Sequence, residues 1–205
     1  MKKLTIAEAE ALARKFRIEN EIGIASPIDV KTLLRQLKIT AMFRPLSRNS
    51  YGISCKSKSG KLFMLINSNS TIGRQHFTIA HELYHLLFEA NPLPHICQGV
   101  VTNEEFNANL FASVLLLPRE GVCKMVSYEE TKSRNVNLAT ILRTEQMFQV
   151  SRQTLLARLR GMGLVSDTCF NKLQQIPVKE SAQEYGYGIS LYEQGNEGET
   201  ISDFG

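Results

Sequence analysis

Two histidines and a glutamate form the motif His81-Glu82-Leu83-Tyr84-His85. On a helix, residues four apart share a face, so the imidazoles of His81 and His85 can reach one metal ion. Glu82 is rotated by about 100° from His81, which places its carboxylate beside the ion, where it can act as a general base on water. The motif predicts a catalytic metal site. A helix with two hydrogen-bonded histidines and a surface glutamate is the alternative interpretation.

The residues around the motif are apolar, and this favours the metal interpretation. They are Phe77, Ile79, Ala80, Leu83, Leu86, Leu87 and Phe88. A helix that is buried on most sides must satisfy the polar groups of its histidines and its glutamate, and a metal ion does this well.

A catalytic zinc site of this kind needs a third protein ligand and one open position for water. The next predicted helix spans residues 102–117. One of its faces carries small and polar residues at helical spacing, which would let it approach the motif closely: Glu105, Ala108, Asn109 and Ala112. We predict that Glu105 is the third ligand, with the adjacent Glu104 as its competitor. A capping box with Thr102 is the alternative role for Glu105.

Three further side chains could bind a metal. His76 precedes the motif, and His95 and Cys97 lie in the predicted loop after it. We expect each of them to be an ordinary surface or packing residue. A fourth ligand from this loop would instead close the site and make it structural.

The elements that must position these residues indicate an α+β fold with a small sheet, a motif-bearing helix and a Glu-bearing helix. Apolar spacing predicts helices over residues 5–19, 74–89 and 102–117, and another that begins at Ser26 with Pro27 in its first turn. "KITAMFRP" is a predicted strand, and residues 51–67 form a predicted hairpin. The strand Leu62 to Ile66 is either an edge for an extended substrate or a buried core strand.

Residues 134–165 predict two short helices separated by a turn that ends at Ser151, a pattern similar to a helix-turn-helix. Arg152 and Gln153 would then lie at the start of the second helix, where base contacts are made, and Arg158 and Arg160 would lie further along it. Residues 126–175 carry seven basic and four acidic residues, a weak excess. We therefore prefer a helical packing unit with solvated arginines over DNA binding.

The sequence predicts three parts: a metallopeptidase domain (1–125), a helix-turn-helix-like module (126–175) and an acidic, Gly-rich tail (176–205). The tail has one lysine against six acids, whereas the whole chain has a net charge of +4. We expect the tail to be a solvated end, with loop or weak strand. The alternative is that it lies across a basic cleft and blocks it.

No apolar run approaches the ~18 residues that a membrane span needs. Charged residues interrupt any signal-peptide core near the N-terminus, from Glu8 to Lys15. The cysteines are widely spaced and form no CxxC pair: Cys55, Cys97, Cys123 and Cys169. We therefore expect reduced thiols and a cytoplasmic protein, and the sequence leaves its oligomeric state open.

Several blocks in the same order resemble the ImmA/IrrE metallopeptidases, over roughly residues 5–165. They are "LFMLIN", "RQHFTIAHELYHLLF" and "EEFNANLFASVLLLP". The resemblance implies a zincin-like endopeptidase in which His81, His85 and Glu105 bind zinc and Glu82 is the catalytic base. Manganese or iron could also fill such a site, since metal supply contributes to selectivity.

The resemblance also implies a protein substrate, a helix-turn-helix repressor of the XRE type, whose cleavage relieves repression in a mobile-element, prophage or stress locus. Residues 126–175 would then be a scaffold or a repressor-docking surface. Many relatives have an acid directly before the Ala-Asn pair, and here that position is Asn107. Two other functions stay open: a non-catalytic DNA- or protein-binding regulator with a structural or vestigial metal site, and a general peptidase.

Overall fold

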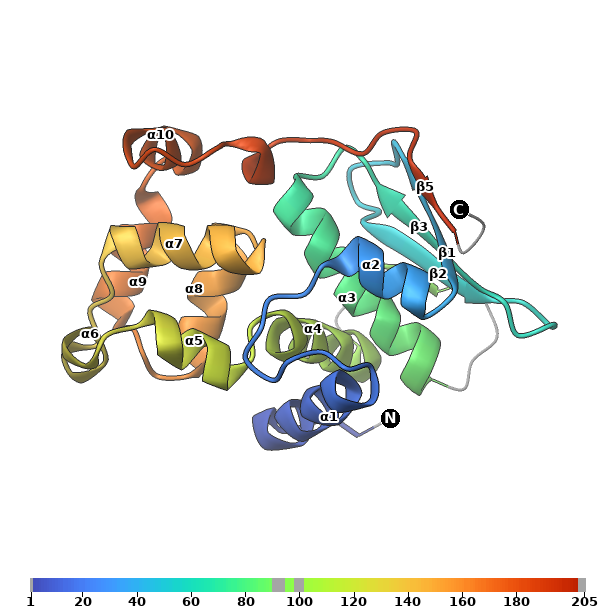
Figure 1. The fold of residues 1–205 in the computed structure, drawn as a ribbon, viewed down its shortest axis with the longest axis horizontal. Coiled ribbons are helices and arrows are strands. Elements are labelled where there is room, and N and C mark those ends of the chain that lie inside the picture. The colour runs from blue at the N-terminus through green and yellow to red at the C-terminus, as the bar shows by residue number, and fades with distance from the viewer. Residues whose placement is uncertain (1, 90–94, 98–101, 203–205) are drawn as a thin grey trace.

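A mixed sheet of five strands lies at one end of the molecule (Figure 1). The structure is a computed structural model that describes residues 2–89, 95–97 and 102–202. The strands lie in the order β4-β2-β3-β1-β5. Their bounds are β1 (Ile39–Arg44), β2 (Gly52–Lys56), β3 (Leu62–Asn67), β4 (His95–Cys97) and β5 (Thr200–Ile201). β1 and β3 are parallel, and every other neighbouring pair is antiparallel.

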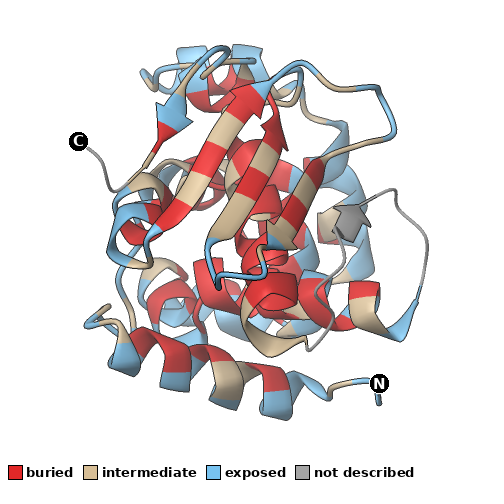
Figure 2. Cartoon of the chain, turned by 90° about the vertical axis from the view of Figure 1, so that its right-hand side faces the viewer, coloured by how far each residue is buried: buried red, intermediate tan, exposed pale blue. Residues whose placement is uncertain are grey.

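The predicted hairpin is confirmed, and it sets the centre of the sheet. β2 and β3 pair in antiparallel register from Gly52–Ile66 to Lys56–Leu62, and Gly60 takes the positive φ of the turn. β3 has β2 on one side and β1 on the other, so it is a core strand and cannot be a substrate edge. Buried and partly exposed residues alternate along the strands, as expected for a sheet covered on one face (Figure 2).

Helices cover the inner face of this sheet. The four helices of the first half are α1 (Ile6–Glu19), α2 (Val30–Gln36), α3 (Ile72–Phe88) and α4 (Asn103–Leu116). α3 packs on β2 and β3 and also on α4, and α1 packs on the other side of α4. Most residues of α3 are buried, as its apolar flanks predict.

The start of α2 differs from the prediction. Ser26 and Pro27 lie before the helix, and Asp29 is its N-cap, with its carboxylate accepting hydrogen bonds from the backbone N–H groups of Lys31 and Thr32. Asp is as good a cap as Ser, and here Asp29 Oδ1 alone accepts from two otherwise unpaired N–H groups. The prediction at Ser26 is therefore wrong by three residues.

The second half of the chain is helical. Its helices are α5 (Arg119–Met125), α6 (Tyr128–Ser133), α7 (Leu138–Phe148), α8 (Arg152–Gly161), α9 (Asp167–Gln175) and α10 (Val178–Glu184). Gln149 takes a left-handed conformation in the turn between α7 and α8, and the Ser151 side chain caps α8. The predicted pair of helices and its cap are confirmed. Among the described helices, none combines the length and the apolar character that crossing a membrane requires.

Residues 176–202 are folded, so the expectation of a solvated end is wrong for them: they form α10 and the segment that follows it. This segment runs through a short 3-10 helix, η1 (Ser190–Tyr192), along the top of the molecule in Figure 1 to β5. The buried Gln75 side chain donates to the Gly195 carbonyl at 2.9 Å and accepts from Asn196 at 2.8 Å. These contacts hold the segment at the start of α3 and at the β1 edge, and β4 lies at the opposite edge of the sheet.

Candidate metal centre

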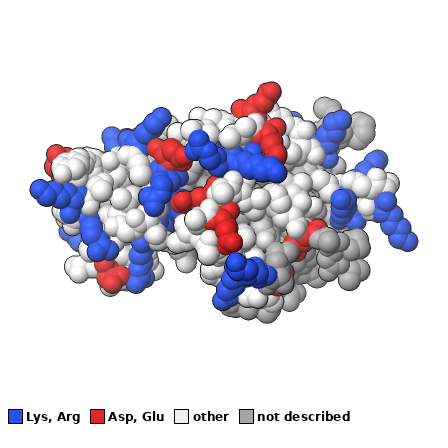
Figure 3. All heavy atoms as spheres, turned by 90° about the horizontal axis from the view of Figure 1, so that it is seen from below, with Lys and Arg blue, Asp and Glu red and all other residues white. Residues whose placement is uncertain are grey.

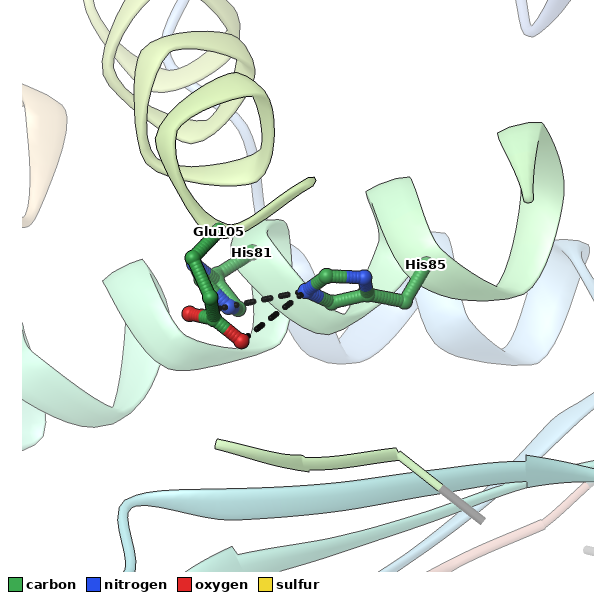
Figure 4. Close-up of side chains that lie close together, drawn as sticks. All are labelled: His81, His85 and Glu105. Atoms are coloured by element: carbon green, nitrogen blue, oxygen red, sulfur yellow. Dashed lines mark hydrogen bonds and ion pairs between the residues drawn. The ribbon is translucent and has the colours of Figure 1, made fainter. Parts of the chain in front are cut away.

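Three side chains on two helices point their ligand atoms at one another (Figure 4). His81 and His85 come from successive turns of α3, and Glu105 comes from the first turn of α4. The two Nε2 atoms are 3.0 Å apart. Glu105 Oε2 lies 3.3 Å from His81 Nε2, and Oε1 lies 3.8 Å from His85 Nε2. All three residues are buried.

These separations fit one small cation. Four ligands at zinc's usual bond lengths sit about 3.3 Å from one another at the corners of a tetrahedron. Two imidazoles and one carboxylate are a donor set typical of catalytic zinc, and three protein ligands leave one position of a tetrahedron open. Among the described residues, the donor set is therefore that of a catalytic site and not of a closed, structural one.

The outer nitrogens of both imidazoles have polar partners. His81 Nδ1–H donates to Asn109 Oδ1 at 3.1 Å, and His85 Nδ1 lies 2.9 Å from Glu89 Oε2. A proton held on Nδ1 leaves the Nε2 lone pair available for a metal, which is how such partners orient histidine ligands. Neither partner was predicted, although Asn109 belongs to the small and polar stripe seen in the sequence.

Glu82 is fully buried beside the triad and faces strand β2. Ser54 Oγ donates to Glu82 Oε2 at 2.5 Å. Gly52 lets the strand approach, since a Cβ there would lie 3.1 Å from Glu82 Oε1 and 2.6 Å from Thr78 Cγ2. The sequence motif identifies Glu82 but gives no sign of Ser54. A glycine inside a predicted strand is a known sign of close backbone approach, and Gly52 shows it.

Glu105, and not Glu104, joins the histidines. Thr102 caps α4 through its hydroxyl, which accepts from the Glu105 backbone N–H at 3.2 Å. The structure contains only this half of a capping box at α4. The Glu105 carboxylate lies at the histidines, so the small and polar stripe predicts the face of α4 correctly.

The weaker candidate ligands lie elsewhere or are not described. His76 packs toward the C-terminal half, with its Nδ1 2.9 Å from the Gln149 carbonyl oxygen. Asn107 turns to the N-terminal segment, where it accepts from the Leu4 N–H and donates to the Lys2 carbonyl. His95 and Cys97 form β4 instead of a loop. Their side chains lie outside the part of the chain that the structure describes.

A cleft of about 480 Å³ opens beside the triad, between α3, α4 and α8. Glu105 and Asn109 border it from α4, and Gln153, Thr154 and Ala157 form its wall on α8. The second helix of the helix-turn-helix-like pair thus faces the metal centre. A polypeptide that reaches the triad through this cleft would contact both halves of the chain.

Arg152 and Arg158 of α8 are buried, so the expectation of solvated arginines is wrong for these two, whereas Arg160 is exposed. Arg152 is buried and pairs with Glu145 at 2.5 Å, and Arg158 is buried and donates to Glu10 at 2.6 Å. Arg160 pairs with Asp167 at 2.8 Å. On the face shown in Figure 3, basic side chains are interspersed with acidic ones. The two buried arginines, Arg152 and Arg158, are poorly placed to contact bases, which supports the packing-unit interpretation of residues 134–165.

Comparison with models of protein families matches residues 34–160 to the IrrE N-terminal-like domain, Peptidase_M78. This range is more than half of the chain and contains all three residues of the triad. The chain belongs to this family. The match agrees with the ImmA/IrrE resemblance found in the sequence. A search of curated proteins finds no match.

Membership in Peptidase_M78, together with the buried His-His-Glu triad, makes this protein a metallopeptidase. A peptidase acts on a protein or peptide substrate. The expected α+β fold is also present, with the motif on α3 and the third residue of the triad on α4.

Proposed function

We propose that this Peptidase_M78 protein is a zinc-dependent endopeptidase that cleaves a helix-turn-helix repressor of the XRE type. The observation that carries the proposal is the convergence of His81, His85 and Glu105, with Glu105 at the border of the cleft. We assign these three residues to the metal and Glu82 to proton transfer. When bound, the ion lowers the pKa of water and polarises the substrate carbonyl.

The residues around the ion supply the rest of the chemistry. Glu82 takes a proton from the attacking water and gives it to the leaving amine. Ser54 holds Oε2 of this carboxylate, so we assign the transferred proton to Oε1. The burial of Glu82 keeps bulk water away from this proton.

The repressor proposal rests on the resemblance to the ImmA/IrrE peptidases, and the cleft is compatible with it. One wall belongs to the proposed peptidase domain, residues 1–125, and the other to the proposed helical module, residues 126–175. A folded repressor would have to present an extended segment between them. A cleft with walls from both parts can select among protein substrates, which a general peptidase does not need.

The first experiment measures metal content by mass spectrometry in the wild type, Glu82→Gln and Glu105→Ala. Glu104→Ala is the matched control, since it removes a neighbouring carboxylate that lies outside the triad. We expect about one ion per chain in the wild type, Glu82→Gln and Glu104→Ala, and most of it lost in Glu105→Ala. A wild type that stays metal-free in the presence of zinc would contradict the proposal.

The second experiment tests the substrate. The wild type and Glu82→Gln are incubated with a panel of XRE-type repressors and with casein. We expect the wild type to cut one repressor at a defined bond and Glu82→Gln to bind that repressor uncut. Cleavage of casein at a similar rate would indicate a general peptidase instead.

A further inference from the structure

The cleft beside the triad is mainly apolar, and one basic side chain is among the described residues that line it. Phe77, Phe106, Leu110 and Ala157 supply apolar surface. Of the described residues that line the cleft, Arg74 alone is basic, and Glu105 alone is acidic. Because the Glu105 carboxylate lies at the two histidines, it is not positioned to neutralise a guanidinium elsewhere in the cleft.

The Arg74 side chain is held by aromatic rings. Its guanidinium carbon lies 4.3 Å from the centroid of the Tyr51 ring and 5.7 Å from that of Phe77. No ion pair joins Arg74 to any described residue, and its Nε makes no hydrogen bond among them although it is shielded from solvent. Stacking fixes the plane of a guanidinium but leaves its N–H groups to bind a carboxylate.

The backbone that carries the Tyr51 ring is ordered by hydrogen bonds. The Tyr51 carbonyl accepts from the Asn67 backbone N–H at 3.0 Å. The buried Asn67 side chain donates to the carbonyls of Ser47 and Ser50 and accepts from the Leu46 N–H. These bonds order the loop before β2 and so position Tyr51. A preorganised cation loses little entropy when it binds a ligand.

The spacing places Arg74 along the path of a substrate. Arg74 and His81 are seven residues apart, two turns of α3, so they share one side of the helix about 10 Å apart along its axis. An extended peptide advances about 3.3 Å per residue. A peptide that lies along α3 with its scissile bond at the triad would bring a side chain about three residues away to Arg74.

We propose that Arg74 is a specificity-determining residue that binds the carboxylate of an Asp or Glu about three residues from the scissile bond. The inference rests on the proposed peptidase function and adds to it the chemistry of the substrate: an extended segment with apolar side chains near the cut and one acidic side chain beyond them. Arg74 selects the substrate and takes no part in bond breaking.

The test uses a degenerate peptide library and mass spectrometry of the cut products. We expect the wild type to enrich Asp and Glu at one position about three residues from the cut, by on the order of tenfold over Gln or Asn. Arg74→Gln should lose this enrichment, Arg74→Lys should retain part of it, and Arg74→Glu should favour Lys or Arg there. Arg35→Gln is the control, because Arg35 is an exposed arginine on α2, outside the cleft.

Metal content and thermal melting of each variant establish that it is folded. Enrichment that persists in a folded Arg74→Gln variant, or that is absent in the wild type, would overturn the inference. If the wild type cuts no peptide, that result contradicts the proposed peptidase function and not the role of Arg74 in binding. Retention of the same library on immobilised Glu82→Gln protein then tests Arg74 without cleavage. Acidic peptides should be retained by this variant, and a double variant that also carries Arg74→Gln should not retain them.

Discussion

Ser54 Oγ lies 2.5 Å from Glu82 Oε2 and joins strand β2 to the buried carboxylate of the motif helix. A hydrogen bond to a charged group is worth about 1.5–3 kcal/mol. Ser54→Ala should therefore lower kcat by roughly tenfold or more, because each 1.4 kcal/mol is about a tenfold change in rate. Metal content should stay at the wild-type level, since Ser54 touches none of the triad.

Ser59→Ala is the control for this change, since Ser59 is an exposed residue in the turn of the same hairpin. Peptide cleavage at saturating substrate measures kcat for both variants. An unchanged kcat in Ser54→Ala would show that Glu82 keeps its position without the serine.

Gly52 is a point of close approach between β2 and α3. A Cβ at this position would lie 2.6 Å from Thr78 Cγ2, so Gly52→Ala must push β2 and α3 apart. Overpacking of this kind costs about 1–3 kcal/mol of unfolding free energy. The displaced carboxylate of Glu82 should lower activity as well.

Urea unfolding and peptide cleavage measure the two effects. Gly188→Ala is the matched control, because a Cβ at Gly188 meets no atom within 4 Å. Equal stability of the two variants would mean that the backbone around β2 relaxes without cost.

Asn109 orients a proposed ligand from outside the triad. Removing the acceptor of His81 Nδ1–H should weaken metal affinity by about 10–100-fold, as is typical for partners of metal-bound histidines. Competition with a fluorescent zinc chelator measures this loss in Asn109→Ala. Asn49→Ala, in the exposed loop between β1 and β2, should bind metal like the wild type.

His76 gives stability a pH dependence of known sign. Burial lowers the pKa of His76, and its hydrogen bond with the Gln149 carbonyl opposes the shift without cancelling it. His76 therefore binds a proton at a higher pH in the unfolded chain than in the folded chain. Stability is complete above the ordinary histidine pKa, about 6.5, and falls as pH drops from there toward the lowered value.

Replacing His76 with Gln removes this group but keeps a donor for the Gln149 carbonyl. Urea unfolding at about pH 7.5 and pH 5.5, on either side of the ordinary histidine pKa, compares the variant with the wild type. Between these two pH values, the wild type should lose more free energy of unfolding than His76→Gln does. His81 and His85 are present in both proteins, so the difference isolates His76. An equal loss would contradict the assignment.

The site was more predictable from sequence than the outer parts of the fold. Short-range spacing on a helix determines which side chains share a face, so the motif and the stripe at Glu105 placed the triad. Partners from distant strands leave no such pattern, which is why Ser54 was missed. A weak strand was expected in the tail, but the position and partner of the two-residue strand β5 were not predicted for the same reason, since Ile201 pairs with Ala41 across most of the chain.

The prediction at Ser26 failed through a different kind of ambiguity. Ser26 and Asp29 are both good N-caps, and a local pattern cannot rank them. The backbone of Ser26 instead serves the buried Arg17, whose guanidinium donates to the Ser26 carbonyl at 2.9 Å and to the Leu115 carbonyl. A contact of that kind depends on tertiary packing and cannot be read from the residues near Ser26.

The bond from Arg158 to Glu10 has a practical meaning for anyone who trims this protein to its family boundaries. A fragment of residues 34–160 would keep the buried guanidinium of Arg158 but discard the carboxylate of Glu10 that it contacts. It would also lose β5, which would leave the backbone groups at the edge of β1 unpaired. An unpaired strand edge favours aggregation, and a buried charge without its partner destabilises the fold. The residues that the family model matches are thus fewer than the residues that an expressed fragment needs for a stable fold.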